Sequence, residues 1–279
     1  MEIQLSSPLP GARAPVVPVG ELLREWRAAR RMSQLDLALD AGLSARHLSC
    51  IETGKARACR EMIGRMADTL GLALRERNAF LVAAGYAPMY PESALAKPEL
   101  ERVRRAIELM LEQQEPYPAF ALDRHWNVLL ANRGAAAVNR LVLGGRESAH
   151  RNLLRQVFDP RDLRAALVNW EEVAGDLIRH LHKVVADSPT DTAARRLLEE
   201  VLAYPGVPAS WRWRELGVKN SPLLTTAFRA ADGRELRFFS TITTFGTPRD
   251  VTLDELHIEC CFPVDEATAS CCRELAAAA

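Results

Sequence analysis

The segment that most constrains the fold spans residues 33–54, SQLDLALDAGLSARHLSCIETG, in which a single glycine separates two short helical patterns. Ser33 and Ser44 are typical N-cap residues, so a helix is predicted to begin immediately after each of them. Gly42 supplies the tight turn between the helices and Gly54 ends the second one, because glycine readily adopts the positive φ that such turns need. Two short helices in close succession are therefore expected here.

The predicted second helix, residues 44–52, has one apolar and one polar face. Leu48 and Ile51 are spaced to point inward. The outer, leading face consists of Ala45, Arg46, Ser49 and Cys50. A short helix, a glycine turn and a second short helix with an exposed polar edge form a helix-turn-helix, whose second helix enters the major groove of DNA. The alternative is an ordinary five-helix bundle whose outer face is only solvated.

Apolar residues at helical spacing predict one helix before this motif and two after it. The stripes consist of Val19, Leu22, Leu23 and Trp26 in the first helix and of Met62, Ile63, Met66, Ala67 and Leu70 in the fourth. In the helix that begins after Ser33, the residues available for burial are Leu35, Leu37 and Ala38. The fifth helix is expected to run from about Leu74 to Gly85. The motif is thus predicted to lie in an all-α unit of five helices.

The segment SQLDLALDAGLSARHLSCIETGKAR resembles the Cro/repressor-type regulators, also called the xenobiotic-response-element family. The matching positions are Gln34, Leu37, Ala38, Ala41, Gly42, Ser44, Ile51, Glu52 and Gly54. The resemblance implies that Gln34 and Ser44 position DNA phosphates and that the outer face defined above lies in the groove. Arg46 can form two hydrogen bonds with a guanine edge, whereas Ala45 can contact only a thymine methyl group.

Lys55 and Arg57 follow this recognition helix, where they would neutralise phosphates and add salt-dependent affinity without sequence information. A homodimer on a palindromic operator in double-stranded DNA is expected, because one short recognition helix reads too few base pairs for specificity. The whole chain has a formal net charge of zero, and residues 1–90 carry only a slight excess of basic residues. The prediction of DNA binding therefore rests on the pattern rather than on charge.

The chain has 279 residues, 48% of them hydrophobic and 26% charged, which is typical of a soluble globular protein of two domains without membrane spans. Residues 1–18 are predicted to be a disordered leader rather than a signal peptide, because they are rich in proline and lack a basic region before an apolar core. The cytoplasm is the expected location. The expected order is the helix-turn-helix domain at 19–87, a linker at 88–97, a second domain at 98–267 and a C-terminal tail at 268–279.

The second domain combines strands and helices. YPAFALDRHWNVLLAN is predicted to form two short strands around a polar turn, after which Asn132 caps a helix. A mostly helical block is expected over residues 151–202, and three antiparallel strands follow, with a hairpin turn at Asp232-Gly233. Two strands, an inserted helical block and three more strands are the layout of a PAS-like α+β domain with a five-stranded antiparallel sheet.

The whole chain resembles the MmyB-like regulators, in which a Cro/repressor-type domain precedes a PAS-like ligand-binding domain. The fragments RHLSCIETGKAR, LRERNAFLVAAGYAP, LDRHWNVLLAN and RNLLRQVFDP carry the resemblance. It implies that the second domain senses a small, largely apolar molecule such as a fatty acid.

The candidate cavity-lining residues are Trp126, Phe158, Trp170 and Phe239, and the candidate head-group ligands are Asn132, Arg151 and Asn152. The aromatic side chains are alternatively plain core. The polar ones alternatively cap helices or satisfy buried backbone groups.

No enzyme, cofactor or metal centre is predicted. The sequence has no phosphate-binding glycine loop, no Gly-x-Ser-x-Gly elbow and no histidine-rich metal motif. Its six cysteines include no Cys-x-x-Cys pair and are expected to be reduced structural thiols. His180 and His182 are two positions apart in a predicted helix and therefore point to different faces. A remaining alternative is that the second domain is a dimerisation or partner-docking module. A closed core would favour this alternative, whereas a cavity of several hundred Å³ would favour a sensor.

Overall fold

The computed structural model describes residues 17–213 and 224–278. The chain divides into two compact units, Met1–Met89 and Tyr90–Ala279. Most of the leader predicted over residues 1–18 lies outside the described residues, and the first helix begins directly after Pro18. Across the described ranges, no helix combines the length and the apolar character that a membrane span requires.

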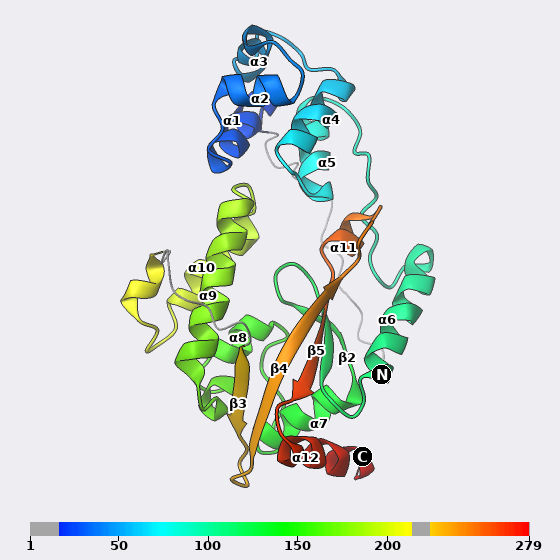
Figure 1. The fold of residues 1–279 in the computed structure, drawn as a ribbon, viewed down its shortest axis with the longest axis vertical. Coiled ribbons are helices and arrows are strands. Elements are labelled where there is room, and N and C mark those ends of the chain that lie inside the picture. The colour runs from blue at the N-terminus through cyan, green and yellow to red at the C-terminus, as the bar shows by residue number, and fades with distance from the viewer. Residues whose placement is uncertain (1–16, 214–223, 279) are drawn as a thin grey trace. The chain divides into compact units, whose positions relative to one another are not determined.

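The N-terminal unit, as far as it is described, consists of five α-helices (Figure 1). They are α1 (Val19–Ala29), α2 (Gln34–Asp40), α3 (Ala45–Glu52), α4 (Arg60–Thr69) and α5 (Leu74–Ala83). Ser33 caps α2, because its hydroxyl oxygen accepts a hydrogen bond from the Asp36 amide while the Asp36 carboxylate accepts one from the Ser33 amide. Ser44 caps α3 by accepting a hydrogen bond from the amide of His47. Both predicted caps are confirmed.

Glycines determine how these helices meet. Gly42 joins α2 to α3 with a φ of 66°, and Gly54 follows α3 with a φ of 72°, in the left-handed region that other residues rarely adopt. Gly20 in α1 has a different role, since a Cβ atom there would lie 2.4 Å from the carbonyl oxygen of Glu52. The backbone of α1 therefore packs directly against the end of α3.

Buried apolar side chains from all five helices form the core of this unit. The largest fully buried ones are Trp26, Phe80, Leu23, Leu37, Leu48, Ile51, Ile63, Met66 and Leu70. The expectation that Leu35 is buried is wrong, because its side chain is 55% exposed. A helix of about two turns presents only a narrow stripe to the core, here Leu37 and Ala38, and Leu35 lies beside that stripe with the exposed Leu39.

An antiparallel five-stranded sheet in the order β2-β1-β5-β4-β3 forms the centre of the C-terminal unit. Its strands are β1 (Ala119–Leu122), β2 (Val128–Ala131), β3 (Thr225–Arg229), β4 (Glu235–Thr244) and β5 (His257–Pro263). Gly233, with a φ of 89°, forms the predicted hairpin turn between β3 and β4. The predicted fold class, an α+β domain with a five-stranded antiparallel sheet, is confirmed.

Between β2 and β3 the chain forms the predicted helical insertion. Its described elements are α7 (Arg133–Val142), α8 (Leu153–Phe158), the 3-10 helix η2 (Leu163–Ala166), α9 (Trp170–Asp187), α10 (Thr192–Leu202) and the 3-10 helix η3 (Ala209–Arg212). The remaining helical elements are the 3-10 helix η1 (Pro98–Leu100), α6 (Glu101–Gln113), α11 (Val251–Asp254) and α12 (Glu266–Ala277).

Different helices cover the two faces of the sheet. On one face, Ile107 of α6 packs in a buried cluster with Ala119 of β1 and Ile258 of β5. Because side chains alternate along a strand, the neighbouring residues Phe120 and Glu259 belong to the opposite face, which α7, α8 and α9 cover. Figure 1 shows α6 on one side of the strands and α8 and α9 on the other.

The region expected to be a tail, residues 268–279, instead belongs to α12 as far as Ala277. Four side chains of this helix are buried, namely Thr268, Ala269, Cys271 and Cys272, and three of them lie at positions i, i+3 and i+4. The hydroxyl of Thr268 accepts a hydrogen bond from the amide of Arg237 at 3.0 Å, which ties α12 to β4. Small and sulfur-containing residues form this stripe, so its apolar periodicity is weak in the sequence.

Candidate functional site

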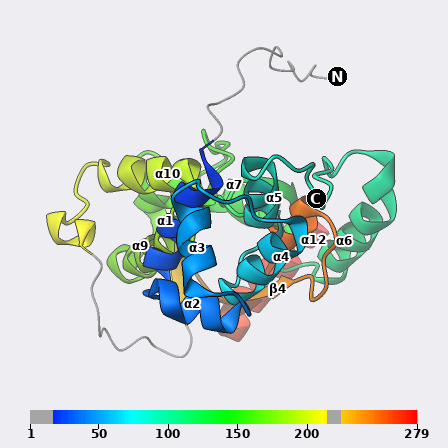
Figure 2. The same cartoon turned by 90° about the horizontal axis from the view of Figure 1, so that it is seen from above.

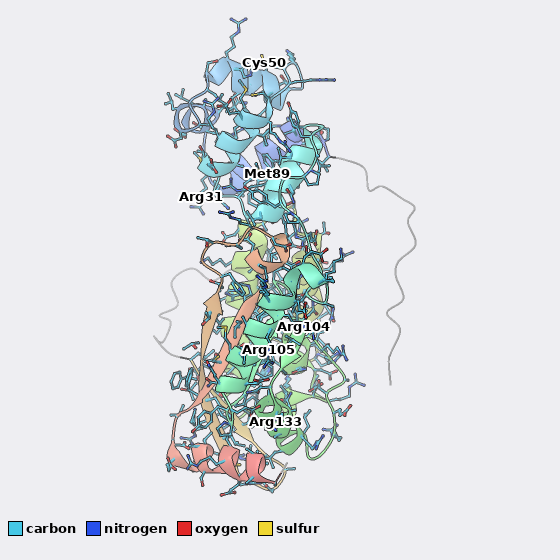
Figure 3. All side chains as sticks on the ribbon, turned by 90° about the vertical axis from the view of Figure 1, so that its right-hand side faces the viewer. Arg31, Cys50, Met89, Arg104, Arg105 and Arg133 are labelled. Carbon is cyan, nitrogen blue, oxygen red and sulfur yellow. The ribbon has the colours of Figure 1, made fainter. Side chains whose placement is uncertain are left out.

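The outer face of α3 carries the side chains that the sequence assigns to a DNA groove. Figure 2 shows α2 and α3 together in the N-terminal unit, and Figure 3 marks Cys50 on α3. Leu48 and Ile51 are fully buried beneath this face. Arg46 is exposed, whereas Ala45, Ser49 and Cys50 are half-buried. The helix therefore presents a small, polar face from which one guanidinium side chain extends.

The residues predicted from the sequence to contact phosphates are Gln34, Ser44, Lys55 and Arg57. Lys55 and Arg57 are exposed, and the Lys55 amide donates a hydrogen bond to the Cys50 carbonyl oxygen at 2.8 Å, which fixes the chain as it leaves α3. The Ser44 oxygen accepts the hydrogen bond that caps α3, at 3.1 Å, and its own hydroxyl proton remains available to a phosphate. Gln34 lies at the first position of α2 and is half-buried.

A buried carboxylate, Glu52, links the three helices of this region. Its side chain is 1% exposed and accepts hydrogen bonds from Arg27 Nε at 2.9 Å and from Gln34 Nε2 at 2.7 Å. The Arg27 guanidinium also donates a hydrogen bond to the Met32 carbonyl oxygen at 2.9 Å. One hydrogen of the Gln34 side-chain amide is thus bound by Glu52, and the second can bind another acceptor. The sequence shows Glu52 as the charged neighbour of the buried Ile51, but the pattern does not identify its partners.

The C-terminal unit contains a pocket of about 310 Å³ between the sheet and the helical insertion. Eight strand residues in its wall share one face of the sheet, namely Phe120, Thr226, Phe228, Phe238, Ser240, Ile242, Glu259 and Cys261. Phe239 of β4 also borders the pocket, although its register places it on the other face. The wall opposite includes Ala135, Val138 and Asn139 of α7, Leu153 and Val157 of α8, and Val173, Asp176 and Leu177 of α9. A concave, mostly apolar wall with a few polar groups is typical of a small-molecule site.

Trp126 enters the pocket from the turn between β1 and β2. Its φ of 67° lies in the left-handed region, which is unusual for a bulky residue. The Asp123 carboxylate accepts hydrogen bonds from the amides of His125 and Asn127 at 2.8 and 2.9 Å, and this arrangement holds the turn. The indole ring meets the His180 ring edge to face, with 5.6 Å between centroids. Backbone in a sparsely populated conformation is often found at binding sites. Here this conformation positions the Trp126 indole in the wall of the pocket.

Of the seven side chains proposed from the sequence to bind a ligand, Trp126 and Phe239 border the pocket and the other five do not. Asn132 and Asn152 are buried N-caps of α7 and α8, as the alternative interpretation of these residues proposes. Arg151 is exposed to solvent beside Asn152.

Phe158 and Trp170 also lie outside the pocket wall, in the core of the helical insertion. Phe158 is fully buried. The Trp170 indole N–H donates a hydrogen bond to the Val157 carbonyl oxygen at 2.9 Å, and the two aromatic rings meet edge to face. Both side chains therefore pack in the core, as the alternative interpretation of these residues predicts.

One carboxyl group in the pocket wall was not identified from the sequence. Glu259 Oε2 is buried and forms no hydrogen bond within the described part of the chain. Burial raises the pKa of Glu259, and a hydrogen bond with the Ser240 side chain opposes this shift only in part. The other acidic residue of the wall, Asp176, is paired with Arg179 at 3.0 Å. A charged residue between Ile258 and Cys260 in an apolar strand is the signal that could have singled out Glu259.

In the described ranges, no group of three or more His, Cys, Asp or Glu side chains is arranged to hold a metal ion. His182 Nε2 lies 2.8 Å from the Trp211 carbonyl oxygen, whereas His180 contacts Trp126, so the two histidines do not share a site. Burial raises the pKa of Cys272 to about 11, which keeps this thiol protonated at neutral pH.

Comparison with known families gives two matches, one for each unit. Residues 103–275 match the MmyB-like transcription regulator ligand binding domain, and residues 18–80 match a helix-turn-helix domain. The first match covers all five strands and the pocket between the sheet and the helical insertion, while the second covers α1 to α4 and most of α5. No curated protein matches the chain.

Proposed function

The chain belongs to the family of MmyB-like transcription regulators, and on this premise we propose that it binds operator DNA as a homodimer and responds to a small, largely apolar effector. The pocket of about 310 Å³ is the observation that carries the sensing part of the proposal. A domain that served only for dimerisation or partner docking would need no such space in its interior.

The DNA-binding part of the proposal rests on the outer face of α3. Arg46 is the exposed member of this face and would read a guanine edge, while Ala45, Ser49 and Cys50 would lie close to the bases. Gln34, Ser44, Lys55 and Arg57 would contact phosphates. A dimer would place two recognition helices about 34 Å apart on successive turns of a palindromic operator, and both half-sites together would supply the specificity.

The ligand-binding part rests on the apolar wall of the pocket. Phe120, Val138 and Leu177 come from β1, α7 and α9 and surround the space with aliphatic and aromatic surface. The apolar chain of a fatty-acid-like molecule would suit this surface. The strand order β2-β1-β5-β4-β3 with helices inserted after β2 supports the PAS-like interpretation of the domain.

The test measures whether effector binding in the pocket changes the affinity for operator DNA. Operator affinity is measured by fluorescence anisotropy for the full chain, with and without effectors identified by native mass spectrometry of the purified protein. A coupling of about 1 to 3 kcal/mol is expected, and operator DNA must change effector affinity by the same factor.

Leu177→Trp narrows the pocket and is expected to abolish the effector response, whereas Leu109→Trp adds the same side chain at an exposed position of α6 outside the pocket and is the matched control. If Leu177→Trp responds like wild type, the pocket is not the sensor. The docking-module interpretation then takes its place.

A further inference from the structure

We propose that the pocket recognises an amphiphile whose polar end is a basic nitrogen, and that the carboxyl group of Glu259 binds this nitrogen. The proposal rests on the ligand-binding function proposed above. It keeps the apolar chain of that effector and gives it a basic nitrogen as its polar end, in place of the carboxylate of a fatty acid. It follows from the position of Glu259, from the charges in the pocket wall and from the unpaired oxygen of this carboxyl group.

Glu259 lies on the pocket face of β5, in the middle of the sheet. It pairs with Phe120 of β1 on one side and with Ile242 of β4 on the other, and both of these side chains also border the pocket. Part of the Glu259 side chain borders the open space, while its Oε2 atom is buried and has no hydrogen-bond donor among the described residues. The terminal torsion of a glutamate is broad, so a modest rotation presents either oxygen to a ligand.

The polar groups of the pocket wall favour a ligand that donates hydrogen bonds over a ligand that carries a carboxylate. Among the described residues that border the pocket, two are acidic, Asp176 and Glu259, and none is Lys, Arg or His. Asp176 already forms an ion pair with Arg179 at 3.0 Å. Glu259 is therefore the acidic group of the wall that has no cationic partner among the described residues, and an ammonium group supplies both the positive charge and the hydrogen that it lacks.

The energetics distinguish three possible head groups. A carboxylate placed beside Glu259 brings two like charges together in an apolar space, or requires that one of them take up a proton. A hydroxyl donates a hydrogen bond without compensating the charge. An ammonium group does both, and charge-assisted hydrogen bonds are about twice as strong as neutral ones. Burial raises the pKa of Glu259, which fits a carboxyl group whose charge lacks compensation until a cation binds.

The experiment compares three probes of equal chain length, octylamine, octanoate and 1-octanol, by isothermal titration calorimetry on the full chain. Wild-type protein is expected to bind octylamine about tenfold or more tightly than octanoate. Glu259→Gln retains the shape of the side chain and is expected to weaken octylamine binding about tenfold while changing 1-octanol binding less than about threefold. Asp176→Asn is the matched control, since it neutralises the paired acid of the same wall, and should leave the preference for octylamine in place.

Two results would overturn the proposal while leaving the pocket as a ligand site. They are binding of octanoate as tight as that of octylamine, and a Glu259→Gln variant with an unchanged ratio of octylamine to 1-octanol affinity. The first comparison uses wild-type protein alone and does not depend on how the variant folds. Failure of all three probes to bind wild-type protein would instead refute the pocket as a ligand site, and the proposal with it.

Discussion

Replacing Glu52 by alanine should destabilise the N-terminal unit more than any change on its outer face. The Glu52 side chain is 1% exposed and its partner Arg27 is 19% exposed, so the ion pair is largely removed from water. Glu52 also accepts the hydrogen bond from Gln34 at 2.7 Å. One carboxylate therefore holds α1 and α2 against the end of α3, and its loss affects all three helices.

The expected loss of folding stability depends on the Arg27 guanidinium, which the Glu52→Ala substitution leaves without its partner. Removing one partner of a buried ion pair typically costs about 3 to 5 kcal/mol, because the other charge stays buried without compensation. Arg27 keeps its hydrogen bond to the Met32 carbonyl oxygen at 2.9 Å and some access to water, which places Glu52→Ala at the lower end, about 3 kcal/mol. Glu52→Gln preserves the shape and one acceptor and should cost about half as much.

Hydrogen exchange measured by mass spectrometry reports this change locally. Peptides from α1 to α3 of the full-length variant should exchange about 100-fold faster than in wild type, since each 1.4 kcal/mol corresponds to a factor of ten. Peptides from the sheet of the C-terminal unit should be unchanged and provide an internal reference.

An exposed ion pair gives the matched control. In α6, Glu108 accepts a hydrogen bond from Arg104 Nε at 3.0 Å, and both side chains are substantially exposed. Figure 3 shows Arg104 on the surface of this helix. Glu108→Gln should cost less than about 1 kcal/mol in α6, because water screens the pair. If Glu52→Ala accelerates exchange in α1 to α3 no more than Glu108→Gln does in α6, the reasoning from burial is refuted.

Three further predictions concern the DNA face and the pocket. Arg46→Ala should weaken operator binding by about 1 to 3 kcal/mol with little effect on random DNA, and equal losses on both at one salt concentration would mean that Arg46 contacts phosphate. Neutralising Lys55 or Arg57 should weaken binding to all sequences alike and reduce the salt slope of binding by roughly one, so an unchanged slope would contradict a phosphate contact. Burial raises the pKa of Glu259 above its ordinary value of 4.5, so the folded state holds this proton longer than the unfolded state and loses stability as the pH rises between the two values. Glu259→Gln should therefore melt at a higher temperature than wild type at neutral pH and at nearly the same temperature near pH 4, and an equal difference at both pH values would disprove the linkage.

The sequence by itself determined the features that depend on neighbouring residues. Ser33 and Ser44 cap helices by binding amides three residues along the chain, and Gly42 forms a turn because of its own backbone freedom. The order of the five strands and the helical insertion in the C-terminal unit was predictable for the same reason, since hydrophobic periodicity and turn residues act within short windows. Helix α12 was not predicted, because small and sulfur-containing residues form its buried stripe. Leu35 shows where periodicity failed, because a two-turn helix has too few residues to define its buried face.

Only the tertiary structure decided which distant groups meet. Arg27 and Gln34 reach Glu52 across 25 and 18 residues, and no local pattern connects them. The sequence allowed Asn132 to be either a ligand contact or a helix cap, and in the structure it caps α7. Glu259 reaches the pocket because β5 pairs with β1 in a register that places it opposite Phe120, and a shift of one residue would have turned it to the other face. Pairing of β1 with β5 joins segments more than a hundred residues apart. The register of the sheet therefore determines which side chains line the pocket, and no single stretch of the chain does so.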